Sequence, residues 1–195
     1  MEKCETYVIK NLTLNNQLKN KELIAFCDKQ IGPGYYKLSD LQRIEANSTS
    51  HGYVSSLLAY TKHDDRLIGV RFTLAPGNWS LEKNIKGFSK TLWPCDPKRV
   101  GYFKSLFIDP EFQKAGLGSK LSLCSLEILK KMAALGIVCH STLNSPNNSS
   151  MKYLTKLGFQ PIKEHPLFWH GIDYECTHCQ KNPCICTAME MFKVI

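Results

Sequence analysis

The stretch Ser105–Leu121, which reads SLFIDPEFQKAGLGSKL, decides the fold of this chain. Its apolar start is typical of a buried strand, its middle is a glycine-bearing loop, and Leu117 opens an amphipathic helix. The first amide groups of a helix lack internal partners and lie at the positive end of the helix dipole, so together they attract anions. Gly116 and Gly118 carry no β-carbon that would hold a ligand away. The stretch therefore predicts a cradle for a diphosphate.

Two other phosphate-binding glycine motifs do not fit this stretch. A Walker loop requires Gly, four residues and then Gly-Lys-Ser/Thr, and the dinucleotide fingerprint requires Gly-x-Gly-x-x-Gly. Neither spacing occurs at residues 105–121. The pattern Gln-x-x-Gly-x-Gly at Gln113–Gly118, after Ile-Asp-Pro-Glu, instead resembles the acyl-CoA loop of the GNAT superfamily of N-acetyltransferases. The alternative is an ordinary helix cap with two incidental glycines, and the flanking elements favour the family.

The elements predicted around this loop follow the order found in the same family. Strands are predicted at residues 7–9, 54–61, 67–74, 100–108 and 137–144, and helices at 14–27, 38–46, from 117 onward and from 146 onward. Gly136 is expected to end the third helix and Gly158 the fourth, and residues 159–174 are long enough for two final strands. The resemblance implies a GNAT-like α/β (α+β) fold, with a mixed, mostly antiparallel sheet of about six or seven strands flanked by about four helices.

The segment Asn147–Phe159 resembles the closing helix of that family, which lies beside the CoA tail. The family pattern is Asn-x-x-Ala-x-x-Leu-Tyr-x-Lys-x-Gly-Phe; it is matched here by Asn147, Lys156, Gly158 and Phe159, while Ser150 stands at the alanine position. The family's tyrosine, often the acid that reprotonates the CoA thiolate, falls on Leu154, and Tyr153 comes one place earlier. Because one residue turns a helical side chain by about 100°, Tyr153 is expected to face elsewhere. Tyr153 is the candidate acid, with a packed aromatic as the alternative.

The resemblance also implies acetyl-CoA as the co-substrate and assigns its contacts. The diphosphate would be held by the loop residues Gln113, Lys114, Ala115, Gly116, Leu117, Gly118 and Ser119. Ile108 would hold the pantetheine backbone, and Asn147 the later part of the donor. An amine would attack the thioester directly in a ternary complex, with backbone amides near Phe107 and Ile108 holding the thioester carbonyl.

The general base is less well defined by the sequence. Many relatives place a glutamate on the strand before the cradle, but residues 100–105 read VGYFKS and offer no carboxylate. His140 lies on the strand expected to splay from this one, and imidazole has an ordinary pKa of about 6.5. His140 is therefore the candidate base. The alternatives are a half-buried histidine with a satisfied ring, and a water relay from another acid.

A second feature is the dense group of cysteines near the C-terminus. Four of the nine cysteines fall within 11 residues in the pattern C-x2-C-x4-C-x-C, namely Cys176, Cys179, Cys184 and Cys186. Four thiolates satisfy tetrahedral zinc and leave no open position, which predicts a structural site. His178 could replace one thiolate. Disulfides and free or redox-active thiols are the alternatives.

Composition and charge bound the remaining possibilities. No apolar run approaches a membrane span, no secretory leader is recognisable, and the cysteine usage favours a reducing, cytoplasmic compartment. Residues 1–174 are expected to form the acyltransferase domain and 175–195 a Cys-rich tail.

The net charge of +8 suits CoA phosphates, nucleic acid or acidic protein surfaces. The basic loop at 79–99 either covers the acceptor site or is a solvated surface loop.

These observations predict an N-acyltransferase that moves an acetyl group from acetyl-CoA to a primary amine on a small molecule or a peptide. The acceptor and the oligomeric state are left open. The alternative is a non-catalytic module of the same fold that binds CoA, protein or nucleic acid through the basic loop and the Cys-rich tail. A metal or redox sensor centred on the tail is a third interpretation.

Overall fold

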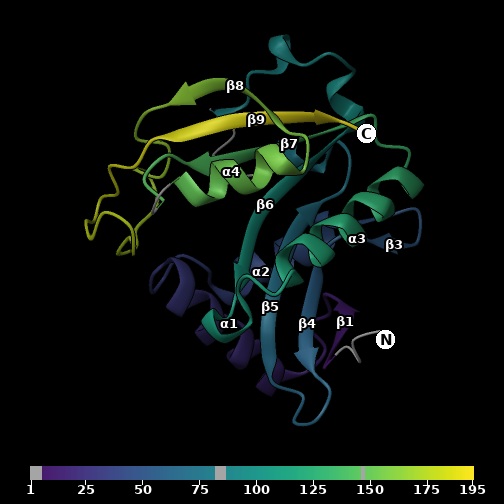
Figure 1. Cartoon of the computed structure of the whole chain (residues 1–195), viewed down its shortest axis with the longest axis vertical. Helices are drawn as coiled ribbons and strands as arrows, with labels where there is room; N and C mark the ends of the chain where they lie inside the picture. Colours follow the sequence, from purple (N-terminus) through teal and green to yellow (C-terminus); the bar gives the residue numbers. More distant parts are fainter. Residues whose placement is uncertain (1–5, 82–86, 146–147) are drawn as a thin grey trace.

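The computed structural model describes residues 6–81, 87–145 and 148–195, which form a sheet with helices on both faces (Figure 1). The helices are α1 (Gln17–Ile31), α2 (Leu38–Asn47), α3 (Leu117–Lys131) and α4 (Ser149–Lys156). The strands are β1 (Tyr7–Asn11), β2 (Thr49–Ser50), β3 (Tyr53–Val54), β4 (Leu57–Thr61), β5 (Leu67–Leu74), β6 (Val100–Ile108), β7 (Gly136–Thr142), β8 (Gln160–His165) and β9 (Ala188–Val194). Short 3-10 turns lie at Asn78–Leu81, Lys90–Leu92, Pro97–Arg99 and Pro110–Phe112.

The main sheet has seven strands in the order β1-β4-β5-β6-β7-β9-β8. All neighbouring strands are antiparallel except β6 and β7, which run parallel. β2 and β3 form a separate small hairpin that the sequence did not indicate. The mixed, mostly antiparallel sheet and its flanking helices confirm the predicted fold class. None of the helices in the described part of the chain is long and apolar enough to cross a membrane.

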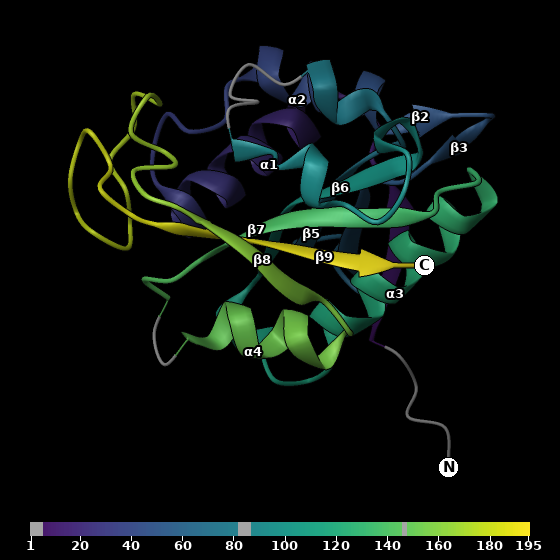
Figure 2. The same ribbon diagram turned by 90° about the horizontal axis from the view of Figure 1, so that it is seen from above.

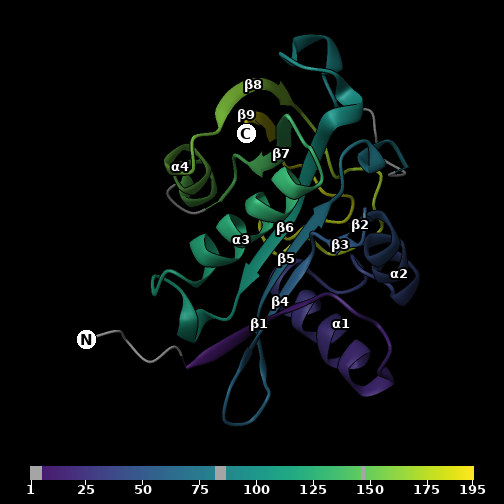
Figure 3. The ribbon, with the colours of Figure 1, turned by 90° about the vertical axis from the view of Figure 1, so that its right-hand side faces the viewer.

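Helices α1 and α2 cover one face of the sheet, and α3 and α4 cover the other (Figures 2 and 3). On the first face, Phe72 of the wholly buried strand β5 packs with Leu23 of α1 and Ile44 of α2. On the second face, Leu121 of α3 packs against Ile68. Burial of such apolar faces supplies most of the stability of a layered domain.

The sheet opens between its two parallel strands. Pairing of β6 with β7 ends at Phe103 and Cys139. Beyond this point β6 still pairs with β5 up to Ile108, and β7 still pairs with β9 up to Thr142. The β5–β6 register also skips Lys104, and such a bulge bends a strand. Because each strand keeps its outer partner and loses the other, a V-shaped opening forms, as expected from the predicted splay.

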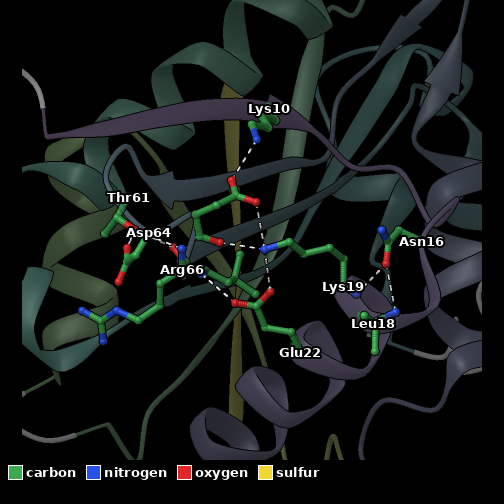
Figure 4. Close-up of polar contacts among 10 residues, drawn as sticks. Lys10, Asn16, Leu18, Lys19, Glu22, Thr61, Asp64 and Arg66 are labelled. Atoms are coloured by element: carbon green, nitrogen blue, oxygen red, sulfur yellow. Dashed lines mark hydrogen bonds and ion pairs between the residues drawn. The ribbon is translucent and has the colours of Figure 1, made fainter.

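Polar contacts fix α1 to the β4–β5 hairpin (Figure 4). The Asn16 side chain caps the helix by accepting hydrogen bonds from the amides of Leu18 and Lys19 at 2.9 and 3.1 Å. Lys19 Nζ then lies 3.0 Å from Glu22 and 2.9 Å from the Asp65 carboxylate in the hairpin. These contacts hold the first turns of α1 against the β4–β5 hairpin.

The structure differs most from the sequence prediction at the end of α3 and after α4. Gly136 does not end α3, because the helix stops at Lys131 and Ala133 turns the chain with a left-handed φ of 58°. Gly136 instead begins β7, where a β-carbon would overlap the Phe192 ring. Residues 159–174 hold one strand, β8, rather than two. The last strand, β9, comes from the segment expected to form the Cys-rich tail, and it lies between β7 and β8.

Candidate active site

A cleft of about 870 Å³ occupies the opening between β6 and β7. It is lined by the glycine-bearing loop, including Gln113, Lys114, Gly116, Gly118 and Ser119. It is also lined by Ile108, His140 and Tyr153, and by Cys176, His178 and Cys186. The cleft therefore brings together most of the predicted donor site, both candidate catalytic residues and part of the cysteine cluster.

The loop and the start of α3 have the geometry of an anion cradle. Gly116 caps the helix with a left-handed φ of 88°, and a β-carbon there would meet no atom within 4 Å. The helix dipole and the unpaired first amides of α3 thus face open space. The Leu117 side chain is buried, so only its backbone is available. Gln113 Nε2 donates to the Ile108 carbonyl at 3.1 Å, so this side chain braces the loop. Asn147 lies outside the described residues.

Tyr153 faces the cleft, contrary to the expectation that it points elsewhere. Its hydroxyl lies 3.0 Å from the Gly118 carbonyl oxygen and 2.6 Å from Ser122 Oγ, which links α4 to the first turns of α3. Burial raises the pKa of the Tyr153 phenol. Leu154, at the family's tyrosine position, is buried with Phe103 and Phe159 in the core. Tyr153 is thus the phenol that α4 presents to the donor loop.

His140 sits in an aromatic cage on the other side of the opening. Its ring stacks on Phe168 with centroids 4.2 Å apart, and it meets the edges of Phe88 and Tyr102 at 5.0 and 5.7 Å. Nε2 lies 2.7 Å from the Gly87 carbonyl oxygen, and Nδ1 has no hydrogen-bond partner among the described residues. Burial lowers the pKa of His140 to about 4. The imidazole is therefore neutral at pH 7 and retains a free acceptor nitrogen.

A buried carboxylate that sequence reasoning missed lies behind this cage. Glu190 of β9 is fully buried and pairs across the strands with His140. Its oxygens accept hydrogen bonds from the Ser89 amide at 3.0 Å, from Trp93 Nε1 at 2.9 Å and from His165 Nε2 at 3.0 Å. Glu190 thereby ties the loop before β6 to β8 and β9. A single acid within the apolar run AMEMFKV was the signal that could have found it.

Sequence reasoning also missed Arg71, a charged residue within the apolar strand LIGVRFTL. Its side chain is only 3% exposed and lines the cleft. The guanidinium carbon lies 3.3 Å from the centroid of the Phe103 ring. An isolated charge at a fully buried strand position was the available signal.

The four tail cysteines converge on one point. All their Sγ atoms lie within 4.8 Å of one another, with 3.9 Å between Cys176 and Cys186 and 3.8 Å between Cys179 and Cys184. Four sulfurs at the Zn–S distance of about 2.3 Å from a tetrahedral ion would be about 3.8 Å apart. A disulfide requires about 2.05 Å, so the four thiols are unbonded here. The geometry suits a tetrahedral metal ion. His178 lines the cleft and is not part of this cluster.

The ionisation of the thiols also bears on metal binding, because the thiolate is the ligand. Burial opposes ionisation of Cys179, but hydrogen bonds from the backbone of Ile185 and Lys181 lower its pKa to about 7. Burial raises the pKa values of Cys184 and Cys186. A cation bound between them would reverse the effect of burial, since a positive charge favours the thiolate.

The sheet parts between two parallel strands, and a helix N-terminus and a glycine loop lie at the opening. This arrangement defines the class of acyl-CoA-dependent N-acyltransferase folds. The chain matches the family model described as Acetyltransferase (GNAT) family over residues 16–159, and it belongs to this family.

Several solved structures share the fold. The structure of the NatC complex bound to Gag peptide and CoA superposes with a TM-score of 0.68 at 11% identity, over 97% of this chain and 98% of that one. Arabidopsis thaliana Naa50, in complex with a bisubstrate analogue, gives 0.61 at 16% identity, over 97% and 99%. The ribosomal-protein-S18-alanine N-acetyltransferase from Escherichia coli gives 0.60 at 12% identity, over 97% and 94%. Comparison with curated proteins finds no match.

Proposed function

We propose that this protein transfers an acetyl group from acetyl-CoA to a primary amine by direct attack in a ternary complex. The observation that carries this proposal is the open, left-handed Gly116 at the start of α3, placed on the cleft where β6 and β7 part. The diphosphate of CoA would lie on the first amides of α3, and its pantetheine arm would run along Ile108. The thioester would then reach the level of His140 and Tyr153.

The chemistry needs a deprotonated amine, because an alkyl ammonium ion with a pKa of about 10.4 has no lone pair to donate. His140 Nδ1 is a neutral, buried acceptor on the cleft wall, and it would take the proton from the attacking amine. Tyr153 would supply a proton to the departing sulfur from the donor side. The two residues face the same cleft from β7 and α4.

A peptide amine is the first acceptor to test. Two of the similar structures carry peptide ligands by name, a Gag peptide and a CoA-Ac-MVNAL bisubstrate analogue. The cleft is also lined by Trp169, whose half-buried indole suits an apolar peptide side chain. Peptides with varied first residues, and small amines beside them, would define the preference.

The proposal is tested by calorimetric titration of acetyl-CoA into the wild type, Gly116→Asp and Gly116→Asn. Asparagine has the shape of aspartate and tolerates the left-handed conformation, so it is the matched neutral control. A carboxylate about 4 Å from a phosphate charge costs roughly 1–4 kcal/mol, so Gly116→Asp should bind at least about fivefold more weakly than Gly116→Asn. No binding by the folded wild type would refute the proposal.

We also propose that Cys176, Cys179, Cys184 and Cys186 hold one structural zinc ion. The sulfur separations of 3.8 and 3.9 Å support this assignment. With four thiolate ligands the ion would have no open position and would perform no step of the reaction. Since Cys176 and Cys186 also line the cleft, the ion would fix the shape of the part of its wall that they form.

A further inference from the structure

Arg71 is a buried cation without a protein counter-ion in the described parts of the chain. Its Nε and Nη2 atoms are shielded from solvent and have no hydrogen-bond partner there. No ion pair with a described carboxylate involves this residue. Stacking on Phe103 offsets part of the cost of burying the charge. A buried charge is normally paired, so the missing partner points to a ligand.

The position of Arg71 indicates which part of a ligand it would meet. Phe103, on which the guanidinium stacks, is the last residue of β6 that pairs with β7. Arg71 therefore lies at the vertex of the opening, and it lines the same cleft as the donor loop and Tyr153. This is the level at which a thioester threaded between β6 and β7 would end.

The titratable groups around the guanidinium are two phenols and a thiol. The titratable side chains that its charge influences are Tyr153, Cys139 and Tyr102. Burial raises the pKa of Cys139 to about 12 and raises that of Tyr153, while the charge of Arg71 opposes both shifts. Burial lowers the pKa of Arg71 itself to about 10, so the side chain remains charged at pH 7. Arg71 thus presents an uncompensated positive charge to the cleft.

We propose that Arg71 stabilises the thiolate that leaves when the acetyl group is transferred, an inference that rests on the proposed function. The amine nitrogen bonds to the thioester carbonyl carbon and loses one proton to the base. The C–S bond then breaks, and its electron pair stays on sulfur. Arg71 pairs with this new negative charge and keeps its own protons, and the sulfur is protonated afterwards. A cation already fixed where charge develops favours the transition state.

The test compares CoA with desulpho-CoA, in which hydrogen replaces the thiol, by calorimetry between pH 6.5 and 9. If Arg71 favours the thiolate and lowers the pKa of the bound thiol by about one unit from its ordinary value of about 8.5, CoA should gain about sevenfold over desulpho-CoA between pH 6.5 and 9. Arg71→Met should abolish this gain, Arg71→Lys should retain part of it, and Arg99→Met, outside the cleft, should leave it intact. Turnover by Arg71→Met should fall about 100-fold, with KM for acetyl-CoA unchanged.

Three results would overturn the inference. If Arg71→Met weakened the binding of CoA and of desulpho-CoA equally, Arg71 would interact with the diphosphate, which both ligands carry, rather than with the sulfur. If Arg71→Met turned over substrate at the wild-type rate, Arg71 would not stabilise the leaving thiolate. If Arg71→Met fails to fold, the wild type alone still tests the proposal. CoA that gains no affinity over desulpho-CoA as the pH rises would then refute it. Failure of the proposed function looks different, since acetyl-CoA and both analogues would then not bind the wild type at all.

Discussion

The Nε2 atom of His140 lies 2.7 Å from the carbonyl oxygen of Gly87. A carbonyl can only accept, so this contact assigns the imidazole proton to Nε2 and leaves Nδ1 as the basic nitrogen. The contact joins the centre of β7 to the loop before β6, which are 53 residues apart in sequence. The loop therefore sets the tautomer of the candidate base.

If His140 is the base, His140→Gln should lower kcat by about 10²–10⁴-fold while acetyl-CoA still binds. Because the pKa of His140 is lowered to about 4, its reactive neutral form persists at pH 7 and is lost only as the pH falls through about 4. Glu190, His165 and Lys104 also act on this titration. Initial rates between pH 4 and 9 would measure the acidic limb. Unchanged turnover in His140→Gln, with exposed His63→Gln as the control, would exclude this role.

Glu190→Gln should destabilise the fold by about 2 kcal/mol at pH 7, because it weakens hydrogen bonds to a buried charged acceptor. Burial opposes ionisation, yet donors from His165, Ser89 and Trp93 lower the pKa of Glu190 below its ordinary value. The contribution is therefore present above the unfolded pKa of about 4.3 and is lost as the pH falls through the lower folded value. Denaturant titrations at pH 7 and pH 4 should show a smaller difference at the acidic pH.

The matched control for that comparison is Glu127→Gln on α3. Among the described residues Glu127 pairs with Lys130 alone, at 3.0 Å on an exposed surface, so its replacement should change stability by less than about 0.5 kcal/mol. If both variants lost equal stability, the buried carboxylate would not be the anchor of the loop.

Purified protein should contain about one zinc ion per chain, and Cys184→Ser should lose it. Removing a ligand of a structural metal is expected to cost at least about 2 kcal/mol, which lowers Tm by about 4–8 °C for a chain of this size. Elemental analysis and thermal melts with and without a chelator would measure both effects. Cys124→Ser, on α3 and outside the cluster, should keep the metal. Metal-free wild type with an unchanged melt after zinc addition would argue against the site.

Asn16→Ala should lower the free energy of unfolding by about 1 kcal/mol, because two amides of α1 lose their acceptor. The neighbouring Asn15 is exposed, and Asn15→Ala is the control that should change stability little. Urea titrations of the two variants would separate the cap from a general effect of losing an asparagine. Equal midpoints for both would mean that the cap is not needed.

The parts of the fold that rest on local sequence were predictable. The strand Val100–Ile108 and the start of α3 at Leu117 agree with the sequence prediction, since an apolar run, a loop and a helix start depend on neighbouring residues. The cysteine spacing likewise indicated a cluster, and the four sulfurs converge. The contacts of the site that depend on distant strands were not predictable in this way.

Three features of the site required the folded chain. Glu190 meets Ser89 and Trp93 from about 100 residues away, so no periodic pattern connects them. Arg71 is the one charged residue of an otherwise apolar strand, and the strand pattern does not show that its side chain reaches the cleft. Tyr153 reaches Gly118 because α4 lies against α3, and a register argument within one helix could not show this. In each case tertiary packing, rather than local preference, positions the side chain.

The internal position of β9 has a consequence for the order in which the protein can fold during synthesis. β8 is joined to the sheet only through β9, and β7 has an open hydrogen-bonding edge until β9 pairs with it. A nascent chain that has emerged only to the cysteines therefore carries an unfilled slot between two strands, and such edges invite wrong partners. Residues 188–194 must therefore emerge from the ribosome before the sheet can close around the strand that carries His140.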